Sequence, residues 1–239
     1  MSRQALDKKT WLQLRITLCN SYNLPNTNWA RVINLFKNRI QDFYFTPIKQ
    51  ILELNELRGE GFSILTLQCA LIEMFAAFRL GKIYQHGTSK NDPGYIYYSP
   101  SEYFIQFLET ESIFENYFFI TNQNKKTKIA SPFSAKGFYR NVRCGLMHEA
   151  RTKEGWVINA KKGYANSDEI LIKKNKVKNT ISIDRTMLNK RLETYFEKYL
   201  MELMEESKAG YALRRLFGRK LDHLFDIPRN KAYDWWEDK

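Results

Sequence analysis

The stretch Phe138–Trp156 reads FYRNVRCGLMHEARTKEGW, and we read the rest of the chain outward from it. It contains His148, one of only three histidines among 239 residues. It also contains three arginines, Arg140, Arg143 and Arg151. An apolar segment with helical spacing precedes the motif and a β-prone segment begins at Trp156, so we expect a helix followed by a strand.

The composition is that of a folded, strongly basic protein. Hydrophobic residues make up 44% of the chain, which is ample for a packed core, and the net charge is +12 at pH 7. A positive balance of this size favours an acidic partner, of which nucleic acid is the commonest. The simpler alternative is a soluble protein whose basic residues only face water.

The cysteines and histidines argue against a disulfide scaffold and against a metal site. Cys19, Cys69 and Cys144 are far apart and lie among apolar residues, which predicts free thiols in a reducing cytoplasm. With three histidines and dispersed acids, we expect no metal and no other cofactor. We expect no membrane association, because the N-terminus lacks a signal-like apolar run and the apolar stretch 64–80 carries polar and charged residues.

Helical periodicity dominates most of the chain. Apolar residues recur at helical spacing in four segments, at about 29–43, 62–80, 185–206 and 211–225. Shorter helices are expected at 48–57, after an interruption at Pro47, and at 103–108, where the aromatic run 114–119 is a candidate extension. Residues 10–22 fit a strand or a short helix equally well.

Three β-prone runs follow the central stretch, at 156–158, 169–172 and 180–183. They predict a small antiparallel sheet or hairpin, with the lysine-rich residues 173–178 as a connecting loop. The predicted fold is therefore mainly α, a helical bundle with a small antiparallel β hairpin or sheet inserted before the last long helix. We expect a helical extension at 1–60, a helical domain at 61–206 with the β insertion at about 155–183, and a basic helix with an aromatic tail at 207–239.

Arg143 and His148 are separated by four residues within the predicted helix. This arrangement resembles the Arg-x(4–6)-His motif of HEPN-domain ribonucleases, and the resemblance extends over about residues 60–206. A second pair, Arg79 and His86, has similar spacing, but it straddles a glycine and enters a loop, so we interpret it as coincidence.

The resemblance implies a HEPN-like bundle and a metal-independent endoribonuclease that leaves 2′,3′-cyclic phosphate ends. In that interpretation His148 is the general acid or base, Arg143 holds the phosphate and Glu73 orients one of them. Six further residues are candidate RNA contacts: Arg140, Asn141, Arg151, Lys173, Lys174 and Lys176. The resemblance also implies a homodimer, and a role as a toxin or in antiphage defence with an antitoxin or a defence-system partner protein.

The residues leave other interpretations open. On a regular helix, residues five apart differ by about 140°, so Arg143 and His148 would not share a face, whereas Arg140, Cys144 and His148 would. A purely structural alternative pairs Arg143 with a carboxylate such as Glu73 and uses His148 at the helix C-terminus, where a cation is favoured. A non-catalytic HEPN-like module that binds RNA or a protein partner, and a DNA-binding regulator that uses the terminal basic helix, remain alternatives.

Overall fold

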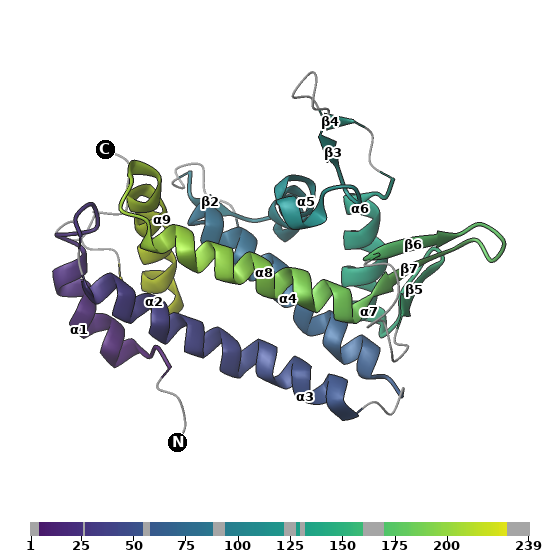
Figure 1. Cartoon of the computed structure of the whole chain (residues 1–239), viewed down its shortest axis with the longest axis horizontal. Helices are drawn as coiled ribbons and strands as arrows, with labels where there is room; N and C mark the ends of the chain where they lie inside the picture. Colours follow the sequence, from purple (N-terminus) through teal and green to yellow (C-terminus); the bar gives the residue numbers. More distant parts are fainter. Residues whose placement is uncertain are drawn as a thin grey trace. The chain divides into compact units, whose positions relative to one another are not determined.

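A computed structural model describes residues 5–25, 27–54, 58–87, 94–121, 128–129, 132–159 and 170–228. The described chain is mainly α-helical with a small sheet of few strands, as the sequence predicts (Figure 1). Its residues group into two compact units. Unit 1 consists of Met1–Phe43, Met74–Ser99 and Phe196–Lys239, and unit 2 of Tyr44–Glu73 and Pro100–Tyr195. The three-part division expected from the sequence stays a prediction, and the Trp235–Trp236 tail lies outside the described residues.

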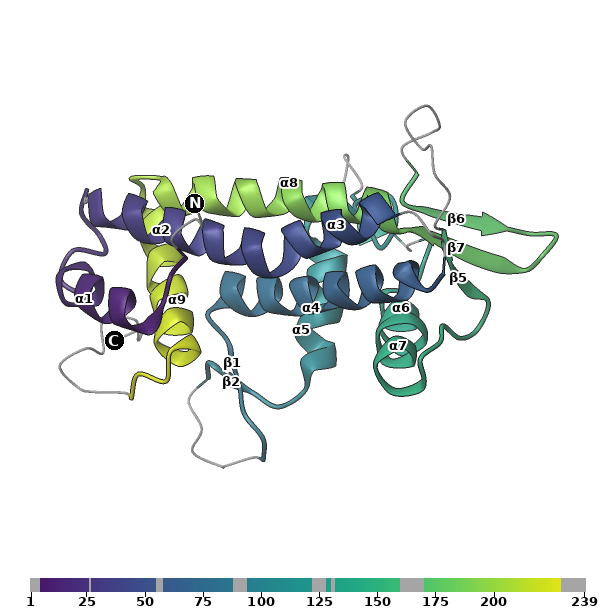
Figure 2. The ribbon, with the colours of Figure 1, turned by 90° about the horizontal axis from the view of Figure 1, so that it is seen from below.

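Unit 1 is built from helices whose aromatic side chains meet in one cluster. Its main helices are α1 (Lys8–Leu18), α2 (Thr27–Ile40), α9 (Lys208–Leu224) and the C-terminal parts of α4 (Glu60–Leu80) and α8 (Arg185–Met204) (Figure 2). The ring of Phe36 on α2 lies 4.9 Å from Phe78 on α4 and 5.0 Å from Phe217 on α9. Phe75 stacks on Phe196 with centroids 5.4 Å apart. Residues 10–22, left open by the sequence, are therefore mostly helical, since α1 covers most of them.

A buried ion pair joins α1 to α9 within unit 1. The Arg15 guanidinium on α1 donates from Nε and Nη2 to the two carboxylate oxygens of Asp222 on α9, each at 2.6 Å. The Trp11 indole donates to the same carboxylate at 2.9 Å. Buried charges require this kind of pairing, so the terminal helices are held by a specific contact as well as by apolar packing.

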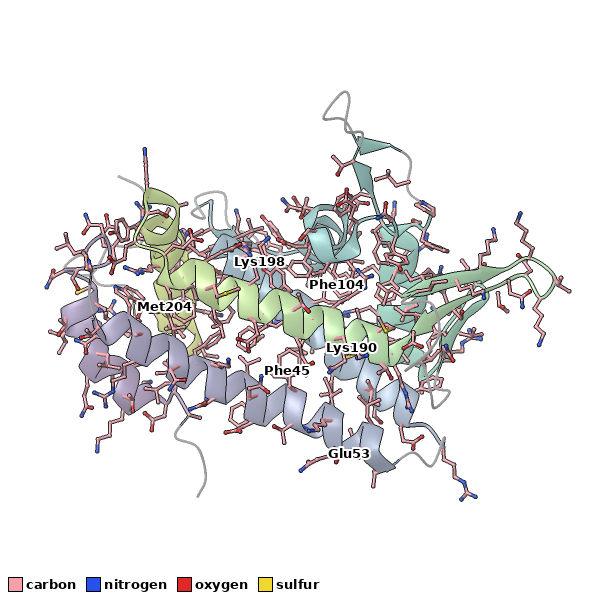
Figure 3. The ribbon with its side chains drawn as sticks, in the orientation of Figure 1. Phe45, Glu53, Phe104, Lys190, Lys198 and Met204 are labelled. Carbon is pink, nitrogen blue, oxygen red and sulfur yellow. The ribbon has the colours of Figure 1, made fainter. Side chains whose placement is uncertain are left out.

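Unit 2 packs aromatic residues around the helix that precedes the central motif. Its helices are α3 (Thr46–Leu54), the N-terminal parts of α4 and α8, α5 (Pro100–Thr110), α6 (Ala135–Phe138) and α7 (Cys144–Glu149). Phe104 on α5 is fully buried, and its ring lies 5.2 Å from Tyr139 and 6.2 Å from Phe138 (Figure 3). Phe138 in turn packs edge-on against Trp156, which fixes the motif segment between α5 and the sheet.

The expected aromatic extension of α5 was wrong. The helix ends at Thr110, and a short 3₁₀ turn, Ser112–Phe114, follows it. Asn116 has a positive φ of 68°, a conformation that no helix contains. The aromatic run is buried through tight turns, because Phe114 and Phe118 insert into the core rings instead of continuing a helical face.

The sheet of unit 2 is mixed, with order β5–β7–β6. Its strands are β5 (Trp156–Asn159), β6 (Ile172–Asn175) and β7 (Thr180–Asp184). The predicted antiparallel hairpin is present as β6–β7, but β5 pairs with β7 in parallel. The first half of the lysine-rich segment is therefore a strand and not a loop, since Lys173 and Lys174 belong to β6. Two-residue strands form two further pairs, which join β1 (Ile83–Tyr84) to β2 (Ile96–Tyr97) and β3 (Ile120–Thr121) to β4 (Lys128–Ile129).

Wide π-helical turns occur at two places where the sequence suggested a break or a regular helix. One, Gln41–Phe45, joins α2 to α3 directly before Pro47. Proline cannot donate the backbone hydrogen bond that a regular helix needs, and a wider turn accommodates this without ending the helix. The expected interruption is thus a change of helical pitch. The other, Tyr139–Arg143, lies inside the central motif.

Helix α4 is long and apolar enough to cross a membrane by length and composition alone. Most of the apolar stretch of this helix is buried inside the protein, as in the core helix of a soluble protein. This one helix is therefore weak evidence for a membrane span. The cytoplasmic location stays a prediction.

Replacing Asp222 with alanine should destabilise the protein by about 3–5 kcal/mol, because the buried Arg15 guanidinium would lose the carboxylate that accepts two of its hydrogen bonds. The matched control is Glu53→Ala on α3, whose exposed contact with Lys49 at 4.0 Å should contribute less than about 1 kcal/mol. Urea unfolding followed by circular dichroism measures both changes. Equal effects of the two substitutions would contradict the importance of the buried pair.

Candidate functional site

The motif helix is assembled from three short segments. Ser134 begins it by accepting a hydrogen bond from the Gly137 backbone at 2.9 Å, and α6 then passes into the π-helical turn and α7. Ala150 ends the helix in a left-handed conformation with φ 51°. The helix therefore continues past His148, so the chain does not turn back before this histidine.

The chain folds back tightly after the helix ends. A side chain at Gly145 would collide with the Arg151 carbonyl oxygen, so the close approach requires glycine there. The backbone N–H of Lys153 donates to the Asn141 carbonyl at 2.9 Å. Asn141, a predicted RNA contact, thus uses its backbone to hold this return loop against the π-helical turn.

Arg143 is held by an ion pair with Glu73 on α4. Its Nη2 donates to Glu73 Oε2 at 2.9 Å, and the two side chains are 18% and 29% exposed. The guanidinium also lies 5.5 Å from the centre of the Tyr139 ring. Burial alone would lower the Arg143 pKa, but the hydrogen bond and charge of Glu73 outweigh it and raise the pKa above its usual value. Arg143 is therefore a permanently charged, positioned group.

His148 lies in the last turn of α7 and is exposed. Within the described part of the chain its side chain forms no hydrogen bond and no ion pair. The segment from Cys144 to Glu149 is regular α-helix, so the offset of about 140° between Arg143 and His148 remains. The structure brings Arg143 to Glu73, and it leaves His148 on a different face of the same helix.

The other arginines of the motif differ in their surroundings. Arg140 is exposed, and the π-helical turn changes its angular relation to the residues after Arg143, so the common face predicted for a regular helix does not carry over. Arg151 donates to Glu149 at 3.0 and 3.1 Å, and Lys153 contacts the same carboxylate. Arg151 therefore neutralises an acid next to His148.

Cys69, on α4 beside the motif helix, does not have the character of a catalytic nucleophile. Burial raises the pKa of the Cys69 thiol to about 12, which keeps it protonated. Cys144 is half-buried, and both are free thiols. Among the residues that the structure describes, no group of three or more His, Cys, Asp or Glu side chains could hold a metal ion.

The lysines predicted to contact RNA lie on a separate element of unit 2. Lys173, Lys174 and Lys176 are exposed on the β6–β7 hairpin, and Lys178 at its turn is exposed as well. Lys178 was predicted only as part of the lysine-rich segment 173–178. Tyr139 was not predicted, and its place four residues before Arg143 on a helix was the available signal.

The basic C-terminal helix does not present the charged surface that the sequence suggested. Arg214, Arg219 and Lys220 are all buried in unit 1. Arg214 donates from Nε to the Leu203 carbonyl at 2.9 Å, at the end of α8, where backbone oxygens lack helical partners. Lys220 lies 5.6 Å from the centre of the Phe78 ring. A DNA-binding surface built on these side chains is therefore excluded.

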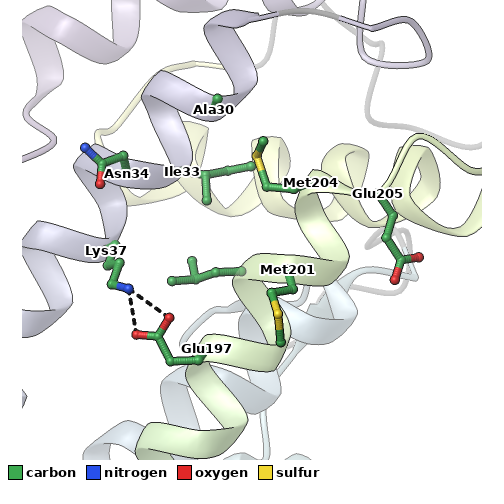
Figure 4. A pocket seen from close by; sticks show the side chains of 9 residues that line it. Ala30, Ile33, Asn34, Lys37, Glu197, Met201, Met204 and Glu205 are labelled. Carbon is green, nitrogen blue, oxygen red and sulfur yellow. Dashed lines mark hydrogen bonds and ion pairs between the residues drawn. The ribbon is translucent and has the colours of Figure 1, made fainter.

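The described surface has a depression in each unit. In unit 1 a groove of about 480 Å³ runs between α2 and α8, where Lys37 and Glu197 form an ion pair at 2.8 Å and Met201 and Met204 are exposed (Figure 4). In unit 2 a depression of about 410 Å³ lies between α4 and α7. Its lining residues are Phe62, Ser63, Thr66, Leu67, Leu146 and Ala150. Only the second adjoins the motif helix.

Comparisons of the chain with protein-family models, with curated proteins and with solved structures found no match. The function must therefore be argued from the residues and their geometry.

Replacing the buried Lys220 with methionine should raise the free energy of unfolding at pH 7 by about 3 kcal/mol, because burial lowers the lysine pKa from 10.5 to about 8. The unfolded chain then binds more protons than the folded chain between about pH 8 and 10.5. Wild-type stability should rise with pH across this window, and the advantage of the methionine should be largest below pH 8 and fade toward pH 10.5.

Urea unfolding of both proteins at several pH values measures this difference. The matched control is Lys190→Met, at an exposed position. The difference in unfolding free energy between this variant and the wild type should not shrink as the pH rises. If Lys220→Met is more stable than the wild type by the same amount at every pH, the desolvated charge of Lys220 is not the cause.

Proposed function

We propose that this chain is a metal-independent endoribonuclease of the HEPN type, in which Arg143 and His148 act on the scissile phosphate. The observation that carries the proposal is the contrast between two side chains of one helix. Arg143 is fixed and charged through Glu73, whereas His148 is exposed and uncommitted. One group is suited to bind a phosphate, and the other to exchange a proton with a substrate.

RNA supplies its own nucleophile for this reaction, so the protein needs no activated water. The 2′-oxygen attacks phosphorus, its proton passes to a base, the bond to the 5′-oxygen breaks, and an acid protonates the leaving oxygen. Histidine suits both roles because it titrates near neutral pH. Arg143 donates to Glu73 through Nη2, and a guanidinium has five N–H donors, so others remain for the charge that develops on the phosphate.

Two chains would complete the site. Arg143 and His148 lie on different faces of the motif helix, so one copy does not direct both groups at one phosphate. A symmetric dimer that meets beside the motif helix would place two of each group around one wet cleft. Apolar exposure supports a contact there, since Met147 is 52% exposed and Phe62 borders the depression between α4 and α7.

A non-catalytic module that binds RNA or a protein partner is the second candidate. Its support is that the Arg143–Glu73 pair alone accounts for a half-buried arginine, and a histidine in the last turn of a helix is favoured by the helix dipole. Salt-sensitive RNA binding without cleavage, both in EDTA and in magnesium, would favour this candidate over the enzyme.

Substitution of His148 by alanine should slow cleavage of RNA in EDTA by at least about 100-fold, the contribution usual for a general acid or base. The rate is measured on an end-labelled RNA, and the products are tested for 2′,3′-cyclic phosphate ends. The matched control is His86→Ala, since His86 is also exposed and follows Arg79 at similar spacing. Equal cleavage by wild type and His148→Ala would rule out His148 as the general acid or base.

Expression in a bacterial host extends this test to the proposed role as a toxin or defence effector. Growth arrest with RNA fragmentation is expected for the wild type and for His86→Ala, and not for His148→Ala. An antitoxin or a defence-system partner protein would then be sought by its ability to suppress the arrest.

The protein should be a homodimer at micromolar concentration, with light scattering giving about twice 28.5 kDa. Met147→Glu should produce a folded monomer that no longer cleaves RNA, because a charge would replace an apolar contact beside the motif. The control is Met201→Glu on α8, a methionine that is 63% exposed in unit 1, which should leave the dimer intact. A monomeric wild type that still cleaves would rule out the shared cleft.

A further inference from the structure

The β6–β7 hairpin concentrates positive charge without any acid to balance it. Residues 171–183 read LIKKNKVKNTISI, with lysines at Lys173, Lys174, Lys176 and Lys178 and with no aspartate or glutamate. Within the described part of the chain, none of these lysines forms an ion pair. Asp184, the next acid along the chain, is buried and accepts hydrogen bonds from the first turn of α8.

Several basic residues elsewhere in unit 2 are paired with a carboxylate. Arg143 pairs with Glu73, Arg151 and Lys153 pair with Glu149, and Lys49 approaches Glu53. The hairpin thus differs from these sites in presenting lysines that no carboxylate occupies, which leaves them available for an external anion.

The lysines point to both sides of the hairpin. In the β6–β7 register Lys173 lies opposite Ser182 and Lys174 opposite Ile181, and adjacent residues of a strand face opposite ways. The side of Lys174 carries the buried Ile172 and Ile183 at the base of the hairpin. Toward the tip both sides reach solvent, so the hairpin is a finger that is charged on two faces.

The tip of the finger is held in a defined turn. Asn175 Oδ1 accepts hydrogen bonds from the backbone of Val177 at 3.1 Å and of Lys178 at 3.0 Å. Asn179 completes the turn with φ 45°. Val177 between the turn lysines is 96% exposed. The hairpin extends away from α6 and α7 in both ribbon views (Figures 1 and 2).

We propose that the β6–β7 hairpin is a sequence-independent anchor that inserts into the minor groove of double-helical RNA, with lysines on its two faces contacting the phosphate backbones on either side. A single charged face would suit one strand, whereas a two-faced finger suits a groove with a phosphate wall on each side. The minor groove of A-form RNA is wide and shallow, and its major groove is too narrow and deep for side chains to read.

The chemistry of the finger fits backbone contacts. Lysine is a point charge that binds phosphate without base geometry, and the finger has no arginine or glutamine. Its two asparagines lie in the turn, where Asn175 Oδ1 already accepts backbone hydrogen bonds. The choice of RNA over DNA rests on the proposed ribonuclease function. The anchor would direct the enzyme to structured RNA and leave the cut to the motif helix.

The test measures binding in the His148→Ala protein, so that cleavage plays no part. The probes are a 20-base-pair RNA duplex, single-stranded oligo(U) and a DNA duplex of the same sequence. Replacing all four hairpin lysines with glutamine should weaken binding to the RNA duplex roughly tenfold or more, and lower the magnitude of the slope of log K against log salt by about 0.9 per lysine. The matched control, with the same change in net charge, replaces Lys8, Lys9, Lys190 and Lys208, which are exposed elsewhere, and should alter both far less.

Single substitutions test the two-faced geometry. Lys173→Gln and Lys174→Gln should each lower the slope by a similar amount, because the two lysines would contact opposite walls of one groove. An effect confined to one of them, or tighter binding to oligo(U) or to the DNA duplex than to the RNA duplex, would overturn the proposal.

A purely protective role for the lysines would overturn it as well. Lysines on an edge strand prevent pairing between chains, and in that case the glutamine protein would aggregate while its soluble fraction bound RNA as before. A failure of the proposed anchor can be distinguished from a failure of the proposed ribonuclease function. Hairpin-dependent duplex binding without any cleavage would support the anchor and reject the nuclease, and His148-dependent cleavage with hairpin-independent binding would do the reverse.

Discussion

The ion pair between Arg143 and Glu73 is the constraint on which the candidate site depends. It ties the motif helix to α4, and neither charge could stay half-buried without the other. Because Arg143 must face α4, the regular helix after it carries His148 around to solvent. The π-helical turn ends at Arg143 and so sets where the arginine emerges, while the tight return at Gly145 fixes where the helix ends.

The long helices were predictable because their apolar residues recur at the helical period and their first turns carry recognisable caps. Asp184 before α8 is one of these, and it accepts the expected backbone hydrogen bonds from Thr186 and Met187. Pro47 marked the first π-helical turn only as an interruption, and no residue pattern marked the second, Tyr139–Arg143. Strand β6 was placed too early because its exposed lysines lack the apolar alternation by which a strand is recognised.

The net charge of the sequence was a poor guide to the charge at the surface, because composition does not report burial. The segments 173–178 and 214–220 are both rich in basic residues, yet the first is exposed on a hairpin and the second contains buried cations. Arg214 is buried because it donates to a backbone oxygen at the end of α8. This contact exists only when the two helices pack together, so the sequence does not show it. The net charge of +12 therefore overstates what the surface offers to nucleic acid, and the unpaired lysines of the hairpin matter more than the total.

The Arg143–Glu73 contact was foreseen from the residues, but it serves both the catalytic and the purely structural interpretation equally well. His148 separates them better. A cation in the last turn of an exposed helix gains only about 0.3–1 kcal/mol from the helix dipole, and lysine or arginine would gain the same. This chain holds 38 lysines and arginines and only three histidines. What histidine adds at such a position is the ability to give and take a proton near neutral pH, which a structural role does not use and a phosphoryl-transfer reaction does.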